Sequence, residues 1–142
     1  MRKLGIDYGD TRVGIAITDA LGITAQGLET VNCNGNDKIL LKRLDEIMEN
    51  YKVDTIVVGM PLNMKGKQSA RAEVTNKFIH KLKCKYNKIK IETIDERLTT
   101  VQAHKTMNDL NINKTKKRGI VDTIAAVYIL ETYMNNSKNR WR

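Results

Sequence analysis

The chain has 142 residues, of which 41% are hydrophobic, 29% are charged and 5% are aromatic. This length and composition predict one soluble globular domain and exclude a disordered or collagen-like chain. The formal net charge of +9 is confined to residues 76–142, since residues 1–75 are neutral overall. A basic half of this kind indicates a polyanionic partner such as nucleic acid, although a solvated, solubilising surface explains it equally well.

The N-terminal third is predicted to consist of strands. Apolar runs at residues 4–7 and 13–17 flank a turn at residues 10–12, which predicts an antiparallel hairpin. A third strand is expected over residues 27–31. The chain therefore begins with antiparallel strands.

Helices and strands alternate after residue 32. Apolar periodicity predicts a helix over 37–51, a strand over 54–58, a helix over 69–86, a strand over 89–94, a short helix from Thr99 or Thr100, and a last helix over 118–134. Residues 59–66 and 108–117 are expected to be loops, and residues 135–142 a frayed polar tail outside a domain of residues 1–134. The order of elements predicts an α/β fold, a mixed sheet with helices on both faces.

Two sequence features limit the cellular location and the metal chemistry. No apolar run reaches the roughly 20 residues that cross a bilayer, and Asp7 interrupts the first apolar run, so we expect a cytoplasmic protein without a membrane partner. Cys33 and Cys84 form no C-x-x-C pair, and we expect both to be at least half-buried and not disulfide-bonded. His80 and His104 lack the spacing of zinc ligands.

Acidic residues stand at positions where burial is costly. Asp7 ends the first strand, and Glu96 follows Asp95 at the end of a later strand. Asp122 lies in the apolar run 120–130 of the last helix. Each has a purely structural alternative: a turn at Asp7, a helix start at Glu96, and an ion pair of Asp122 with Arg118.

Carboxylates from two strand ends and a buried helix can meet at one edge of the sheet. Such a set suits hard divalent cations, Mg²⁺ or Mn²⁺. Two of these cations can stabilise the attacking and leaving oxygens of a phosphodiester. The sequence contains no G-x-x-x-x-G-K-[ST] and no G-x-G-x-x-G motif, so it gives no support to P-loop or Rossmann nucleotide binding.

These and neighbouring motifs resemble the YqgF/RuvX family of small bacterial RNase H-like nucleases, through nearly the whole chain to about Met134. The resemblance rests on GIDYG at 5–9, RVGIA at 12–16, LGITA at 21–25, VGMPLNM at 58–64, DERLTT at 95–100, and VD and AA at 121–122 and 125–126. One departure is Ser69, where many relatives carry glycine.

The resemblance implies an RNase H-like fold with a five-stranded mixed sheet and a metal-dependent nuclease that processes the 5′ end of pre-16S ribosomal RNA. It implies that Asp7, Glu96 and Asp122 are the catalytic, metal-binding triad, with Asp95 in support. The partners would be a ribosomal RNA precursor or a pre-ribosomal particle. Phosphate contacts are expected from a basic and polar set that could equally be ordinary surface or turn residues: Arg12, Asn63, Arg97, Lys117 and Arg118.

Three other functions remain open at this level. The same triad would serve a DNA enzyme that cuts branched junctions, which the family's older label, Holliday junction resolvase, also suggests. Asp7–Thr11 resembles the first phosphate loop of actin-like kinases, although this chain has the length of only one of their two lobes. A non-catalytic RNA-binding assembly factor would use the basic half and leave the triad without a role.

Overall fold

The computed structural model describes residues 1–61, 70–96 and 114–139, and in the last segment the side chains of residues 122–136. The described elements follow the order β1 (Arg2–Asp7), β2 (Arg12–Thr18), β3 (Ala25–Asn32), α1 (Asp37–Asn50), β4 (Val53–Met60), α2 (Ala70–Lys85), β5 (Lys90–Asp95) and α4 (Lys114–Asn139). Most of the predicted loop 59–66 and the helix expected at Thr99 or Thr100 lie outside the described residues.

The sheet has five strands in the order β3-β2-β1-β4-β5. β1 and β2 pair antiparallel, as do β2 and β3, whereas β4 runs parallel to both β1 and β5. This confirms the predicted hairpin and the mixed sheet. Because β1, β4 and β5 are parallel, Asp7 and Asp95 both lie at the carboxyl edge of the sheet.

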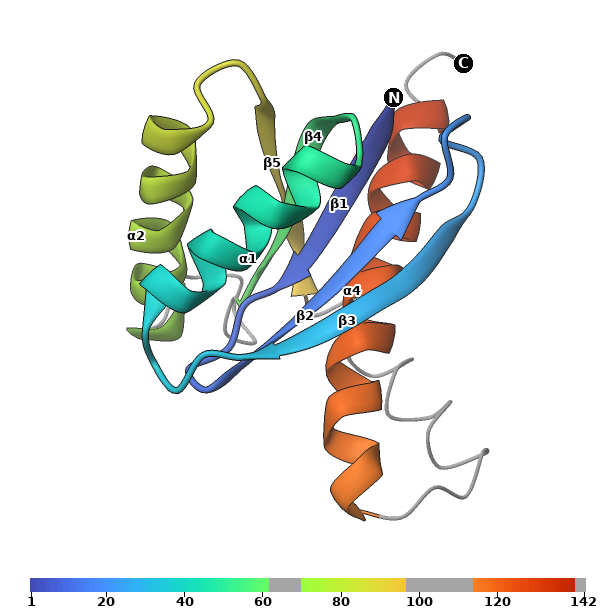
Figure 1. Ribbon diagram of the computed structural model, residues 1–142. Coiled ribbons are helices and arrows are strands. Elements are labelled where there is room, and N and C mark those ends of the chain that lie inside the picture. The colour runs from blue at the N-terminus through green and yellow to red at the C-terminus, as the bar shows by residue number, and fades with distance from the viewer. Residues whose placement is uncertain (62–69, 97–113, 140–142) are drawn as a thin grey trace.

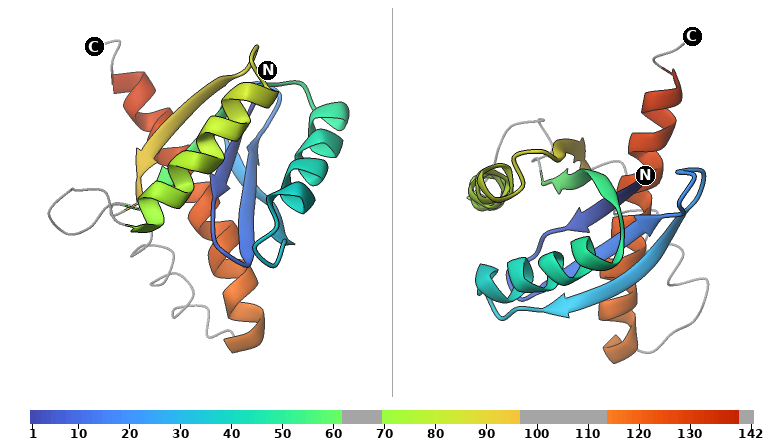
Figure 2. Two further views of the ribbon diagram at one scale, coloured as in Figure 1. Left: turned by 90° about the vertical axis from the view of Figure 1, so that its left-hand side faces the viewer. Right: turned by 45° about the horizontal axis from the view of Figure 1, so that its top comes forward.

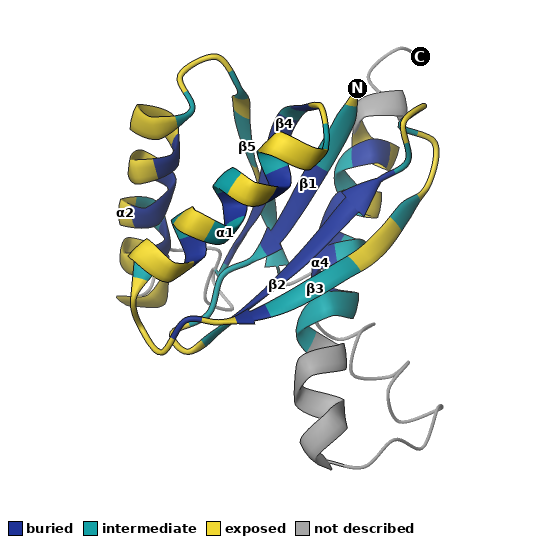
Figure 3. Ribbon diagram, viewed as in Figure 1, coloured by how far each residue is buried: buried dark blue, intermediate teal, exposed yellow. Residues whose placement is uncertain are grey.

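Helices cover both faces of the sheet, as the order of elements predicts. α1 and α2 pack on one face, and α4 crosses the other face against β1, β2 and β3 (Figures 1 and 2). Figure 3 shows the buried residues gathered between these layers. Two separate apolar clusters result, a large one beneath α1 and α2 and a smaller one beneath α4.

The last helix is longer than the sequence predicts, and that expectation was wrong at both ends. α4 begins at Lys114 instead of 118 and continues to Asn139, through most of the predicted tail. Its 26 residues span about 39 Å, whereas strands of six to eight residues span roughly 20–27 Å. The N-terminal part of α4 therefore projects past the sheet (Figure 1).

The two cysteines differ in exposure. Cys33 is buried, as expected, and its thiol lies 3.6 Å from the carbonyl oxygen of Thr11. Cys84 is exposed, contrary to expectation, because it lies on the solvent side of α2 beside His80, 3.6 Å from the imidazole Nε2. Both thiols are free. In the described segments, no helix combines the length and apolar character that crossing a bilayer requires.

Candidate active site

The carboxyl edge of the sheet brings Asp7 and Glu96 together. The Asp7 carboxyl group forms a side-chain hydrogen bond with the carboxyl group of Glu96. Burial raises the pKa of Asp7 well above its usual value, and the hydrogen bond and negative charge of Glu96 raise it further. The positive charge of Arg71, in the first turn of α2, acts in the opposite direction. A half-buried carboxyl group with a raised pKa, next to a second carboxyl group, is typical of a functional site.

Asp122 reaches the same region from α4. Its Oδ2 accepts a hydrogen bond from Arg12 Nε at 3.0 Å, and 20% of the Asp122 side chain is exposed. Burial and the negative charge of Asp7 raise the pKa of Asp122, while Arg12 lowers it. Asp122 therefore forms an ion pair with Arg12 of β2, and the expected pair with Arg118 is not tested. The side chain of Arg118 lies outside the described set.

Glycines in the strands let α4 approach this closely. A Cβ atom on Gly14 would lie 2.0 Å from the carbonyl oxygen of Asp122, and one on Gly27 2.3 Å from Thr123 Cγ2. On Gly59, a Cβ would meet Glu96 Cγ at 2.6 Å. In the sequence, Gly14 and Gly59 were noted only as motif members and Gly27 only as the start of a strand, although glycine inside a strand is a known sign of close backbone approach.

The residue after Asp7 is held by the helices on the opposite face. The Tyr8 hydroxyl donates to Asp37 Oδ1 at 2.5 Å, and the Tyr8 ring stacks on Phe78 with centroids 4.3 Å apart. Lys81 contributes an ion pair to Asp37 Oδ2 at 2.9 Å. Sequence patterns did not identify this network, because its members are far apart in the chain.

The structure places only one of the residues predicted to contact phosphate. Arg12 lies in the site, on Asp122. Asn63 and Arg97 fall outside the described residues, and Lys117 and Arg118 belong to the N-terminal part of α4, where only the backbone is described. Arg71, which the sequence analysis did not single out, acts electrostatically on Asp7. Its only signal was a basic residue at the start of a helix after a polar loop.

The acidic set has the donor chemistry of a divalent-cation site. Carboxylate oxygens are the ligands that Mg²⁺ and Mn²⁺ prefer. Burial first, and mutual repulsion second, raise the pKa values of Asp7 and Asp122, and a cation would relieve the repulsion. Within the described residues, however, no three such side chains are arranged as a ready ligand group. Arg12 occupies an oxygen of Asp122 in this arrangement.

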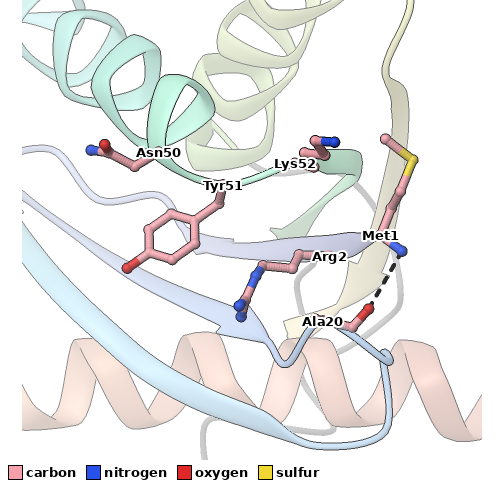
Figure 4. Close-up of a pocket in the computed structure, with 6 residues that line it drawn as sticks. All are labelled: Met1, Arg2, Ala20, Asn50, Tyr51 and Lys52. Carbon is pink, nitrogen blue, oxygen red and sulfur yellow. Dashed lines mark hydrogen bonds between the residues drawn. The ribbon is translucent and has the colours of Figure 1, made fainter.

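A pocket of about 410 Å³ lies elsewhere, at the start of β1 (Figure 4). Its lining consists of Met1, Arg2, Ala20, Asn50, Tyr51 and Lys52. None of the predicted site residues is among them, and Asp7 ends the same strand at its opposite end. The pocket is therefore separate from the carboxylates.

Comparison with known proteins assigns the chain to a family. The profile described as "RuvX: Holliday junction resolvase" matches residues 1–136. The chain belongs to the RuvX family. Relatives named "Putative pre-16S rRNA nuclease" include proteins of Acetivibrio thermocellus (51% identity, 96% of each chain) and Clostridium tetani (44% identity, 99% of this chain and 100% of the relative). The family resemblance inferred from the motifs is thus confirmed, and with it a nuclease family.

Solved structures confirm the fold of this RuvX-family chain. The fowlpox virus Holliday junction resolvase matches with a TM-score of 0.60 at 14% identity, covering 96% of this chain and 99% of that one. Thermus thermophilus RuvC in complex with a Holliday junction substrate matches with a TM-score of 0.57 at 12% identity, covering 95% and 96%. At these identities the likeness extends to the architecture alone, the RNase H-like fold expected from the motifs.

Proposed function

We propose that this RuvX-family protein is a metal-dependent nuclease that hydrolyses phosphodiester bonds and processes the 5′ end of pre-16S ribosomal RNA. The observation that carries the proposal is the hydrogen-bonded pair of Asp7 and Glu96 at the carboxyl edge, with Asp122 electrostatically coupled to Asp7. Desolvation next to a second carboxyl group raises the pKa of Asp7, and we infer that function is the reason for retaining this arrangement.

Asp7, Glu96 and Asp122 are the residues that would hold Mg²⁺ or Mn²⁺, in a two-cation arrangement. When bound, such cations neutralise charge on the phosphate and favour deprotonation of a water molecule. The chain's own contribution is to position oxygen ligands. Asp7 is anchored by the strand pairing of β1 on both sides, and Asp122 by the contact of its backbone with Gly14.

A proton on Asp7 would compete with the cation, because a carboxyl group must be ionised to act as a ligand. Arg71 opposes the raised pKa of Asp7, so its charge favours the ionised form that a cation needs. We assign Arg71, together with Arg12, to the contacts with substrate phosphate, where arginine binds well.

Ribosomal RNA is the substrate suggested by the names of the relatives, and the pre-ribosomal particle is the partner we propose on the same ground. The charge of residues 76–142 supports a nucleic-acid substrate of either kind. A branched DNA substrate is the second candidate, because structures of the same fold include resolvases, two of them in complex with a Holliday junction.

Cleavage assays on two substrates test the proposal. Wild type, Asp7→Asn and Asp122→Asn are incubated in Mg²⁺ or Mn²⁺ with an RNA that carries the pre-16S 5′ extension, and separately with a four-way DNA junction. Glu46→Gln serves as the matched control, since Glu46 is a carboxylate on α1 that pairs with Arg43 at 2.7 Å. We expect wild type and the control to cut the RNA, and both Asp variants to lose at least 100-fold in rate.

The alternatives give different patterns. If the protein cleaves the junction in preference to the RNA, its substrate is branched DNA. If Asp7→Asn cleaves the RNA as fast as wild type, the assignment of the active site to these carboxylates is wrong. Tight RNA binding without cutting in either cation, on free RNA and on the immature ribosomal particle, would favour the non-catalytic assembly factor.

A further inference from the structure

The contact between Arg12 and Asp122 lies between two rigid elements. Arg12 begins β2, whose ladder with β3 starts at the pair Arg12 and Asn32. Asp122 belongs to α4, whose backbone lies against Gly14 of the same strand. Strand and helix are therefore fixed relative to each other, and only side-chain rotation can separate the two groups.

The two side chains differ in their access to solvent. Arg12 is 38% exposed and Asp122 is 20% exposed, so the guanidinium has a path outward that the carboxylate lacks. Arginine carries five N–H donors, and the structure uses Nε for Asp122 Oδ2. A long, partly exposed arginine can exchange one anionic partner for another at little energetic cost.

A divalent cation and Arg12 would compete for the carboxylate of Asp122. Asp122 is the proposed ligand whose carboxylate is committed to a positive side chain, while Asp7 and Glu96 bond to each other. Two positive groups on one carboxylate repel, and this repulsion is strong where water is partly excluded. Cation binding therefore has to displace the guanidinium or work against its charge.

We infer that Arg12 is an exchange residue: it holds Asp122 until a divalent cation takes the carboxylate, and the released guanidinium then binds a substrate phosphate. The inference rests on the proposed function and deepens it, because it sets an order in which cation binding precedes tight phosphate binding. Arg12 thereby couples the two events, and removing it separates them. By linkage, a substrate phosphate that draws Arg12 away also strengthens cation binding by the same factor.

Cation affinity measured without substrate tests the first half. Mn²⁺ binding to wild type, Arg12→Gln, Arg12→Lys and Arg43→Gln is followed by calorimetry, with circular dichroism as the check of folding. We expect Arg12→Gln to bind Mn²⁺ roughly fivefold more tightly, the worth of a half-exposed ion pair. Arg12→Lys, which keeps the charge, should stay close to wild type. Arg43→Gln should be unchanged, because Arg43 pairs with Glu29 and Glu46 on α1's side of the sheet.

RNA affinity with and without a divalent cation tests the second half. Ca²⁺ replaces Mg²⁺ to limit cleavage, and an RNA with a non-hydrolysable linkage is bound by each variant. We expect Ca²⁺ to strengthen RNA binding by wild type several-fold more than by Arg12→Gln. Equal strengthening in both variants would overturn the phosphate-binding half.

The outcomes separate the two claims. If wild type binds Mn²⁺ but Arg12→Gln binds it equally or more weakly, the exchange is wrong and the nuclease proposal stands. If wild type binds no Mn²⁺ at millimolar concentration, both the metal-dependent nuclease and the exchange are overturned.

Discussion

The two faces of the sheet are built on different principles. Beneath α1 and α2, large side chains such as Phe78, Leu4 and Leu44 are fully buried and interlock. Beneath α4, large side chains such as Ile129 and Leu130 are buried in a smaller cluster, and Gly14 lets the helix backbone come close to the strands. The first face therefore buries more apolar surface, and the second sets finer distances between backbones.

This difference separates stability from geometry. Apolar burial contributes to stability roughly in proportion to area, and side chains can adjust to small changes. Where a helix packs directly on a glycine, no side chain lies between the two backbones, so an added side chain must shift the helix. The carboxylates lie where such contacts are made, since Asp122 is above Gly14 and Glu96 is above Gly59. We expect substitutions on the two faces to affect stability and activity in different proportions.

Truncation of Phe78 should have the largest effect on stability. Phe78 is fully buried and stacks on Tyr8, so Phe78→Ala is expected to lower the free energy of unfolding by about 3–5 kcal/mol in urea titration. Val74→Ala, on the exposed side of the same helix, should change it by less than about 0.5 kcal/mol. The activity of the folded fraction of Phe78→Ala should stay within a few-fold of wild type.

Gly14→Ala should affect activity more than stability. Its Cβ would lie 2.0 Å from the Asp122 carbonyl oxygen, so α4 must shift, at an expected loss of about 1–3 kcal/mol. The shift moves Asp122 relative to Arg12 and Asp7, and we expect the folded variant to lose at least tenfold in cleavage rate. A folded Gly14→Ala with full activity would contradict the contrast between the faces.

Asp7→Asn should stabilise the protein. The pKa of Asp7 is raised in the folded state, so above its usual value near 3.8 the folded protein holds more protons than the unfolded chain, and stability falls as pH rises through this window. Asparagine cannot ionise, so the variant avoids this loss of stability, which amounts to roughly 1.4 kcal/mol for each unit by which folding raises the pKa. Thermal unfolding between pH 4 and 8 in EDTA should show a higher midpoint and a flatter dependence on pH.

Asp45→Asn is the opposite control, on the other face. Hydrogen bonds from Lys85 and Tyr86 lower the pKa of Asp45. Its carboxylate therefore stabilises the fold at pH values above the usual pKa of aspartate, and this stabilisation is lost as the pH falls through the lowered pKa. Its substitution should slightly destabilise the protein at neutral pH. If Asp7→Asn destabilised the protein as Asp45→Asn does, the burial of Asp7 would carry no energetic penalty.

Tyr8→Phe should have the smallest effect. It removes the 2.5 Å hydrogen bond to Asp37 and keeps the stack on Phe78, with an expected loss of about 0.5–1.5 kcal/mol. Tyr86→Phe removes an equivalent bond to Asp45, at 2.6 Å, and should lose a similar amount in urea titration. A much larger loss for Tyr8→Phe would mean that Tyr8 also supports the carboxyl edge.

Local patterns were sufficient for most of the elements. Alternating and helical spacing identified all five strands and the three long helices that the structure describes, because burial on one side leaves a periodic trace. The ends of α4 were not predicted, because residues 114–118 and 135–139 are almost all polar and leave no such trace in the sequence. The N-terminal hairpin was predicted from a turn and two short apolar runs, which is local information.

The sequence by itself determined the order of elements, the mixed sheet and which acids would be costly to bury. It could not determine the partner of Asp122, because Arg12 lies 110 positions away and meets it only when α4 packs on β2. The meeting of Asp7 and Glu96 likewise depends on the parallel alignment of β1, β4 and β5. Distances of this kind are set by the packing of helices on the sheet, where glycines decide how close two backbones come.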